Sequence, residues 1–221
     1  MKLLASHAFL FKEYLTEDAE RMFGLLSKLC KHHNKDVHRK GFEALDAFLQ
    51  QVANELVAEA RDINSNRATY KFFVRKFFEM LENPAGGVEE ISIAVRGFGR
   101  FAAPTAKYSS IPELKKVLNK LFQFSERYYA KDEATYHMSS FLSSYANILL
   151  HLDQVDSLYI DHLARVIGSI FAYFPTLWPK QRIAHYFAIS RLFTALYSKQ
   201  SALQTLLSRV GTSRTTRQPT N

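Results

Sequence analysis

The sequence contains few of the residues that build disulfide frameworks, metal sites and membrane spans. Its 221 residues include one cysteine, Cys30, which excludes an internal disulfide and any cysteine framework for a metal. No apolar run reaches the roughly 18–20 residues of a transmembrane helix. The first residues are interrupted too early, by His7 and Lys12, for a secretory signal. A reducing intracellular compartment is therefore expected, with no membrane partner.

Acidic residues are outnumbered by basic ones. The chain has 21 Asp and Glu against 29 Lys and Arg, a net charge of +8 at pH 7. A basic balance favours polyanionic partners such as nucleic acid or the acidic face of a protein. Many proteins are mildly basic without such a partner, so both interpretations stay open at this point.

Motifs of common enzymes are also missing. Gly97-Phe98-Gly99 lacks the third glycine and the preceding strand of a dinucleotide-binding loop, and no glycine-rich phosphate loop precedes a lysine. Neither a His-Arg-Asp catalytic loop nor Asp-Phe-Gly occurs. His32, His33 and His38 lack the cysteines or carboxylates that would complete a zinc site. We expect no catalytic site, cofactor, metal or small-molecule substrate; an all-α enzyme would instead show a buried cluster of ionisable residues.

A regular spacing of helix-like patterns is the strongest positive signal. Paired amphipathic segments start near Asp18, Ala68, Ile111 and Ser157, which are 50, 43 and 46 residues apart. A two-helix repeat of about 40–47 residues is typical of HEAT arrays, and no segment alternates long enough to predict a sheet. The sequence therefore predicts an all-α, HEAT-like α-solenoid of about four stacked helix pairs.

The same patterns predict domain boundaries. Residues 1–15 are expected to be an N-terminal extension or incomplete helix, and residues 211–221 a disordered polar tail. The repeats should occupy residues 16–210, with pairs at 16–59, 65–104, 110–153 and 156–198 and a partial unit at 201–210.

Local signals within the repeats give further expectations. Asn64-Ser65-Asn66 should separate two helices, one helix should end near Pro104, and Ser110 with Glu113 fits a capping box. The residues expected on buried stripes include Met22, Leu25, Leu26, Leu29, Leu158, Ile183, Tyr186 and Phe187.

Six basic residues are the candidate contacts for DNA or a partner. Lys31, Lys35, Arg39 and Lys40 cluster around the first helix–helix turn, and Arg96 and Arg100 lie four apart on one helix face. Second helices line the concave side of typical HEAT arrays, where such cations would attract phosphates. The alternatives are an ordinary solvated surface, or a ladder between repeats, because Asp36 to Leu45 resembles the HEAT second-helix pattern.

Two stretches carry a closer resemblance. Residues 90–104 (EISIAVRGFGRFAAP) and residues 136–142 continuing to 148–153 resemble the N-terminal helical region of the DNA-dependent protein kinase catalytic subunit family. The resemblance runs in order through most of Asp18–Leu196. That family comprises very large nuclear serine/threonine kinases of the phosphatidylinositol-3-kinase-like group. Their N-terminal HEAT arm curves around DNA and Ku, and their kinase domain lies at the far C-terminus.

The resemblance implies a function for this chain. It would be a non-catalytic scaffold segment in the nucleus, acting in double-strand break repair by non-homologous end joining. Its partners would be double-stranded DNA ends, the Ku heterodimer and the rest of the parent kinase chain. The alternative is a generic HEAT adaptor that binds proteins without nucleic acid.

Overall fold

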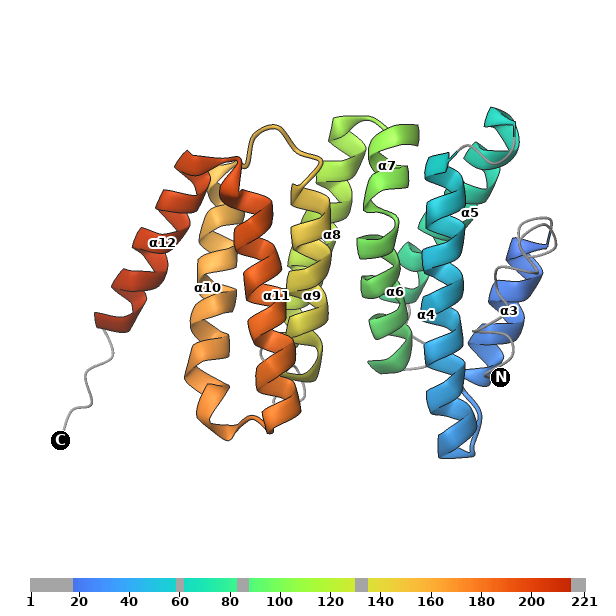
Figure 1. Ribbon diagram of the computed structural model, residues 1–221, viewed down its shortest axis with the longest axis horizontal. Coiled ribbons are helices and arrows are strands. Elements are labelled where there is room, and N and C mark those ends of the chain that lie inside the picture. Colours follow the sequence, from blue (N-terminus) through green and yellow to red (C-terminus); the bar gives the residue numbers. More distant parts are fainter. Residues whose placement is uncertain (1–17, 59–61, 83–87, 130–134, 216–221) are drawn as a thin grey trace. The chain divides into compact units, whose positions relative to one another are not determined.

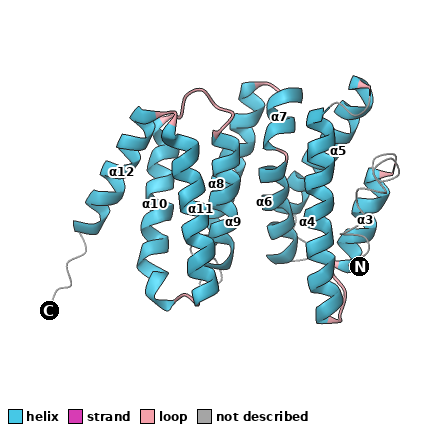
Figure 2. Cartoon of the chain, viewed as in Figure 1, coloured by secondary structure: helices cyan, strands magenta, loops and turns pink. Residues whose placement is uncertain are grey.

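The computed structural model describes residues 18–58, 62–82, 88–129 and 135–215 (Figure 1). These residues form helices and connecting turns, with no strand among them (Figure 2). The chain divides into two compact units, Met1–Leu114 and Lys115–Asn221. The expected extension at residues 1–15 lies outside the described residues.

The first unit contains two helix pairs and a short additional helix. Its elements are α3 (Ala19–Leu29), α4 (Lys35–Ala58), α5 (Ile63–Glu82), α6 (Val88–Arg100) and α7 (Ala102–Tyr108). Helix α3 packs on α4, α5 packs on α6, and α4 lies beside α6 (Figure 1). Phe73, fully buried, lies at the centre of the core, with ring centroids 5.4 Å from Phe23 and 5.2 Å from Phe101.

The second unit is also built only of helices in its described part, and its largest contacts join alternate helices. Helix α8 (Ile111–Tyr129) crosses the boundary between the units and is followed by α9 (Thr135–Leu149), α10 (Ser157–Tyr173), the 3₁₀ helix η2 (Phe174–Thr176), α11 (Pro179–Tyr197) and α12 (Gln200–Thr215). Helix α11 packs along α9, and α12 packs along α10. First helices therefore contact first helices and second helices contact second ones. The predicted all-α helical-repeat class is confirmed.

Two predicted helix boundaries are wrong for identifiable reasons. Helix α5 begins at Ile63, so Asn64-Ser65-Asn66 lies inside it. Asp62 supports this start, because its Oδ1 accepts hydrogen bonds from the N–H groups of Asn64 (2.9 Å) and Ser65 (3.1 Å). Pro104 does not end a helix but lies in the first turn of α7, where its missing N–H costs no hydrogen bond.

Other local expectations have mixed outcomes. At the start of α8 the Ser110 N–H donates to Glu113 Oε2 at 3.1 Å, which is one half of the predicted capping box. Helix α12 continues past Gly211 to Thr215, so the tail predicted from residue 211 begins inside a helix, and residues 216–221 lie outside the described residues.

Several residues expected on buried stripes are exposed instead. In α3 the buried side chains are Ala19, Phe23 and Leu26, whereas Leu25 is 50% exposed. Leu158 in α10 is 67% exposed, and Ile183, Tyr186 and Phe187 on α11 are all more than half exposed. Helical periodicity identifies apolar residues but does not show which of them a neighbouring helix covers.

Two glycines permit the closest helix contacts in the first unit. A Cβ atom at Gly97 of α6 would lie 2.4 Å from ring atoms of Phe77. One at Gly41 of α4 would lie 2.7 Å from the carbonyl carbon of Leu29. Neither distance is compatible with a side chain, so both positions need the absence of a Cβ for close packing.

Candidate nucleic-acid interface

Lys31 lies in the turn after α3 and pairs with a carboxylate of another repeat. Its Nζ forms an ion pair with Glu90 near the start of α6. The Glu90 side chain is only 10% exposed, so the lysine charge compensates a largely buried carboxylate. The contact therefore ties the first helix pair to the second.

Arg39 and Lys40 form ion pairs within α4. The Arg39 guanidinium lies 3.6 Å from Asp36 and 3.4 Å from Glu43, and the Lys40 ammonium also contacts Glu43. The hydrogen bond from Lys40, together with the charges of Lys40 and Arg39, lowers the pKa of Glu43. The Arg39 side chain is 62% exposed and that of Lys40 33%, so Arg39 above all can exchange its partner for another anion at low cost.

Arg96 and Arg100 of α6 share one acidic partner on α4, which belongs to the neighbouring helix pair. Nη2 of Arg100 lies 3.0 Å from Oδ2 of Asp46, and Nη1 of Arg96 lies 4.0 Å from its Oδ1. Arg100 also donates a hydrogen bond to the side-chain oxygen of Gln50. The ladder expected from the Asp36–Leu45 motif is wrong, because Asp36 and Arg39 pair with each other within α4. Asp46 of α4 with Arg96 and Arg100 of α6 links the two repeats instead.

Cations that sequence reasoning missed lie on α5. Arg67 and Lys71 are exposed and make no ion pair with any residue in the described part of the chain, and the same holds for Lys35 among the six candidates. Arg67, Lys71 and Arg75 are four residues apart, which places them on one face at about 6 Å intervals along the helix. This four-residue spacing of basic residues is the sequence feature that could have identified the basic face of α5.

Charge is unevenly distributed along the chain. Asp161 is the last acidic residue, so residues 162–221 carry eight of the 29 Lys and Arg and none of the 21 Asp and Glu. Those sixty residues account for the whole net charge of +8. The six candidate cations all lie in the electrically balanced remainder.

A buried polar cluster tests the all-α enzyme alternative. Ser125 Oγ lies 3.0 Å from His162 Nε2, accepts a hydrogen bond from the Tyr145 hydroxyl at 2.7 Å and donates one to the Phe122 carbonyl at 2.8 Å. A serine beside a histidine is the arrangement of an activated nucleophile. These side chains are almost completely buried, so no substrate can reach the hydroxyl. The cluster joins α8, α9 and α10 as satisfied core polar groups.

The histidines near the first turn form ring contacts. His32 stacks on His33 with a centroid separation of 4.3 Å, and His38 packs edge-on against Phe42. Among the residues that the structure describes, no three His, Cys, Asp or Glu side chains converge to hold a metal ion. Within the same ranges, no helix has the length and apolarity needed to cross a membrane.

Comparison with known proteins identifies the family. Residues 1–220 match the family model described as DNA-PKcs, N-terminal. The chain belongs to the DNA-PKcs family. It is 38% identical over 214 residues to the DNA-dependent protein kinase catalytic subunit of Dictyostelium discoideum, and 32% identical over 215 residues to that of Xenopus laevis. Each alignment covers 95% of this chain, and the chain spans 5% of the length of these DNA-PKcs relatives.

Proposed function

We propose that this chain is a non-catalytic, HEAT-like scaffold segment of a DNA-dependent serine/threonine protein kinase. It acts in the nucleus in double-strand break repair by non-homologous end joining, where it contributes to engagement of DNA ends and of the Ku heterodimer. The observation that carries the proposal is the match of residues 1–220 to the N-terminal DNA-PKcs family model. Helix pairs joined by Asp46–Arg100 and Lys31–Glu90 supply the rigidity that a scaffold needs.

DNA engagement is proposed to use exposed cations of the first unit. Lys35, Arg67 and Lys71 lack a partner among the described residues, so a phosphate would be their first close anion. The paired candidates Lys31, Arg39, Lys40, Arg96 and Arg100 contribute long-range attraction and exchange partners on contact.

The alternative, a protein adaptor that does not bind nucleic acid, is favoured by one observation. Five of the six candidate cations already contact carboxylates of this chain. Neutralised pairs contribute little to polyanion binding, so these residues alone would leave the surface an ordinary scaffold surface.

Binding of a fluorescent, blunt-ended DNA duplex at several salt concentrations separates the two functions. The double variant Arg67→Glu/Lys71→Glu should weaken binding and reduce the slope of log K against log salt by about 2, because each lost phosphate contact changes it by about 0.9. Lys180→Glu/Arg191→Glu on α11 is the charge-matched control. Equal losses in both variants would mean that binding follows net charge, and absence of binding by the unaltered chain would favour the adaptor.

A further inference from the structure

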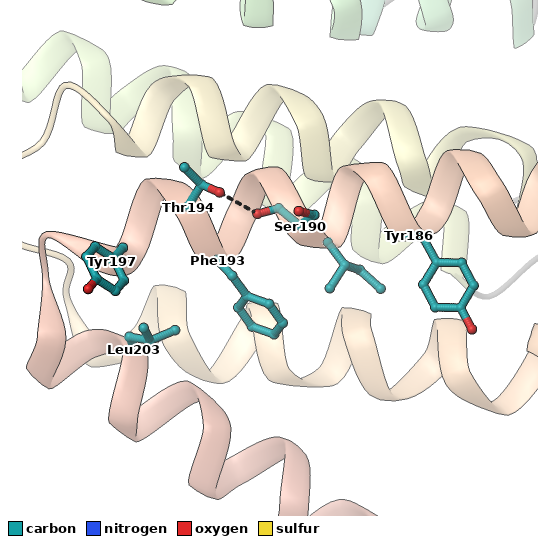
Figure 3. Close-up of a pocket in the computed structure, with 7 residues that line it drawn as sticks. Tyr186, Ser190, Phe193, Thr194, Tyr197 and Leu203 are labelled. Atoms are coloured by element: carbon teal, nitrogen blue, oxygen red, sulfur yellow. Dashed lines mark hydrogen bonds between the residues drawn. The ribbon is translucent and has the colours of Figure 1, made fainter.

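The pocket beside α11 contains no charged side chain. It has a volume of about 510 Å³ and is lined by aromatic, aliphatic and hydroxyl side chains of α11 together with Leu203 of α12 (Figure 3). The hydroxyl of Thr194 in this lining already donates a hydrogen bond of 3.0 Å to the Ser190 carbonyl. Groups that could act on a polyanion therefore lie elsewhere, and two matching charged clusters occur on α4 and α5.

A five-residue motif occurs twice in the first unit. Residues 39–43 read RKGFE on α4, and residues 75–79 read RKFFE on α5. In both copies the glutamate lies three residues after the lysine and four after the arginine, so the three charged side chains meet on one side of the helix. The third residue of each copy faces the interior, since Gly41 approaches backbone atoms of α3 and Phe77 is fully buried.

The carboxylate of the α5 copy contacts two cations. Oε2 of Glu79 accepts a hydrogen bond of 2.7 Å from Lys76, and its Oε1 lies 3.6 Å from Nε of Arg75. The hydrogen bond from Lys76 lowers the pKa of Glu79, desolvation opposes this effect, and the charges of Lys76 and Arg75 lower the pKa further. The carboxylate is therefore ionised at neutral pH. We call these three residues the Glu79 cluster.

The Glu79 cluster lies at the end of a row of cations. Arg67, Lys71 and Arg75, which we call the α5 row, are spaced four residues apart, and Glu79 follows at the same interval. Arg67 and Lys71 form no ion pair with a described residue, whereas Arg75 is paired with Glu79. An anion that lies along α5 thus meets two cations without such a pair, and then two that already share a carboxylate.

A phosphate group and Glu79 compete for the same donors. Both accept charge-assisted hydrogen bonds from arginine and lysine. The side chains of Arg75, Lys76 and Glu79 are 68%, 36% and 51% exposed, and ion pairs this exposed are weak enough for a phosphate to displace the carboxylate. The displaced carboxylate then stays close to the bound phosphates and repels them. Glu79 therefore lowers the affinity of the α5 row for a polyanion.

The copy on α4 has a different balance of charges. Arg39 lies 3.4 Å from Glu43 and 3.6 Å from Asp36, and Lys40 also contacts Glu43. Two cations therefore share two carboxylates on α4, whereas two cations share one in the Glu79 cluster. Removal of Glu43 would leave Arg39 with Asp36, so the α4 copy provides an internal comparison.

We propose that Glu79 is an autoinhibitory counter-anion that sets the affinity of the α5 row for the phosphates of duplex DNA, an inference that rests on the function proposed above for this surface. In the unbound chain Glu79 occupies Arg75 and Lys76. On binding, phosphates take both cations and the carboxylate turns into water. A duplex that also engages Arg67 and Lys71 displaces Glu79 more readily than a single anion does, because its phosphates are already held beside the cluster.

The test measures binding of the fluorescent, blunt-ended duplex to the 221-residue chain at several salt concentrations. Glu79→Gln removes the charge and keeps the length of the side chain. We expect binding at least about tenfold tighter at about 50 mM salt, and a slope of log K against log salt steeper by about 2, because each new phosphate contact adds about 0.9. Glu43→Gln should give a smaller gain, since Asp36 still contacts Arg39.

Two controls separate release of the cations from a change in net charge. Glu20→Gln on α3 removes an exposed acid that forms no ion pair with a described residue, and it should change binding less than about twofold. In the background Arg75→Gln/Lys76→Gln there is no cation to release, so adding Glu79→Gln should also tighten binding less than about twofold. Circular dichroism of every variant verifies that it folds.

The remaining outcomes distinguish this inference from the proposed function. Equal gains from Glu79→Gln in the two backgrounds, or a gain no larger than that of Glu20→Gln, would overturn the inference and leave DNA binding by the chain intact. Absence of binding by the unaltered chain and by every variant would overturn both. Binding by the Glu79→Gln variant alone would support the inference, and would show that Glu79 blocks the α5 row in the unaltered segment.

Discussion

Arg100 and Asp46 join helix α6 to helix α4, with 3.0 Å between Nη2 of the arginine and Oδ2 of the aspartate. Their side chains are 34% and 25% exposed, so water screens this pair less than the pairs on the outer face of α4. Gln50 accepts a further hydrogen bond from the same guanidinium. A planar group held by two partners on one helix is positioned more firmly than a single flexible contact.

Removing either member of this pair should destabilise the first unit. We expect Arg100→Ala and Asp46→Ala each to cost about 1–2 kcal/mol of unfolding free energy, with a coupling of about 0.5–1.5 kcal/mol in a double-mutant cycle. Urea unfolding of the two single variants and the double variant measures this. The same cycle on Arg39 and Asp36, an exposed pair within α4, should give a smaller coupling. Equal coupling energies in the two cycles would show that the Arg100–Asp46 pair stabilises the unit no more than an exposed ion pair does.

A side chain at Gly97 should be poorly tolerated. Gly97→Ala places a methyl group 2.4 Å from the Phe77 ring, and overpacking of this kind costs about 1–3 kcal/mol. Gly24→Ala is the control, because nothing lies within 4 Å of a Cβ there and alanine favours the helix. Thermal unfolding should show a lower midpoint for the first variant only. Phe77→Leu should recover part of the loss if the ring is the obstacle.

Cys30 should be unreactive in the folded chain. Burial raises the pKa of its thiol to about 11, against a smaller opposing effect of the Lys31 charge. The thiolate is the nucleophile, so alkylation by iodoacetamide at pH 8 should be much slower than for a free cysteine. Addition of urea should accelerate labelling as the chain unfolds. Rapid labelling without denaturant would show that Cys30 is accessible.

Stability should fall on mild acidification, in part because of His151. Burial, and then the positive charge of Lys199, lowers the pKa of His151 below its usual value of about 6.5. Below pH 6.5 the unfolded state therefore binds more protons than the folded state, and stability decreases as pH falls. Urea unfolding at pH 7.5 and 5.5 should show a smaller loss for His151→Gln than for the unaltered chain.

A direct titration separates the two causes of this shift. Lys199→Gln removes the positive charge but not the burial, so it should raise the pKa of His151 part of the way towards the usual value. The imidazole proton resonances followed by NMR provide the measurement. An unchanged titration curve would show that burial alone is responsible.

The helix pairs could be predicted from sequence because spacing at three and four residues reports helicity whatever the neighbours are. The start of α5 could not, since Asn64-Ser65-Asn66 looks like a turn until the Asp62 side chain is seen to cap the helix. Burial was least predictable on α11, where Ile183 and Tyr186 are apolar but exposed. Whether an apolar side chain is buried depends on the neighbouring helix that packs against it, and the residue spacing within a single helix carries no information about that neighbour.

The candidate interface shows the same limit. Residue type and clustering along the sequence identify the six cations. Neither feature shows which carboxylates form ion pairs with them in the folded chain. Arg100 contacts Asp46, 54 residues earlier in the chain, and no local pattern relates those two positions. The proposed contacts with DNA and Ku therefore stay predictions. Lys35, Arg67 and Lys71, which form no ion pair with a described residue, are the cations to test first.

Gly41 and Gly97 will not diverge in the same way among related sequences. Position 97 faces a phenylalanine ring, so a lineage can acquire a larger residue there if position 77 shrinks in compensation. Position 41 faces the backbone carbonyl carbon of Leu29, and no substitution removes a backbone atom. We therefore expect correlated variation at positions 77 and 97, and strict retention of glycine at position 41.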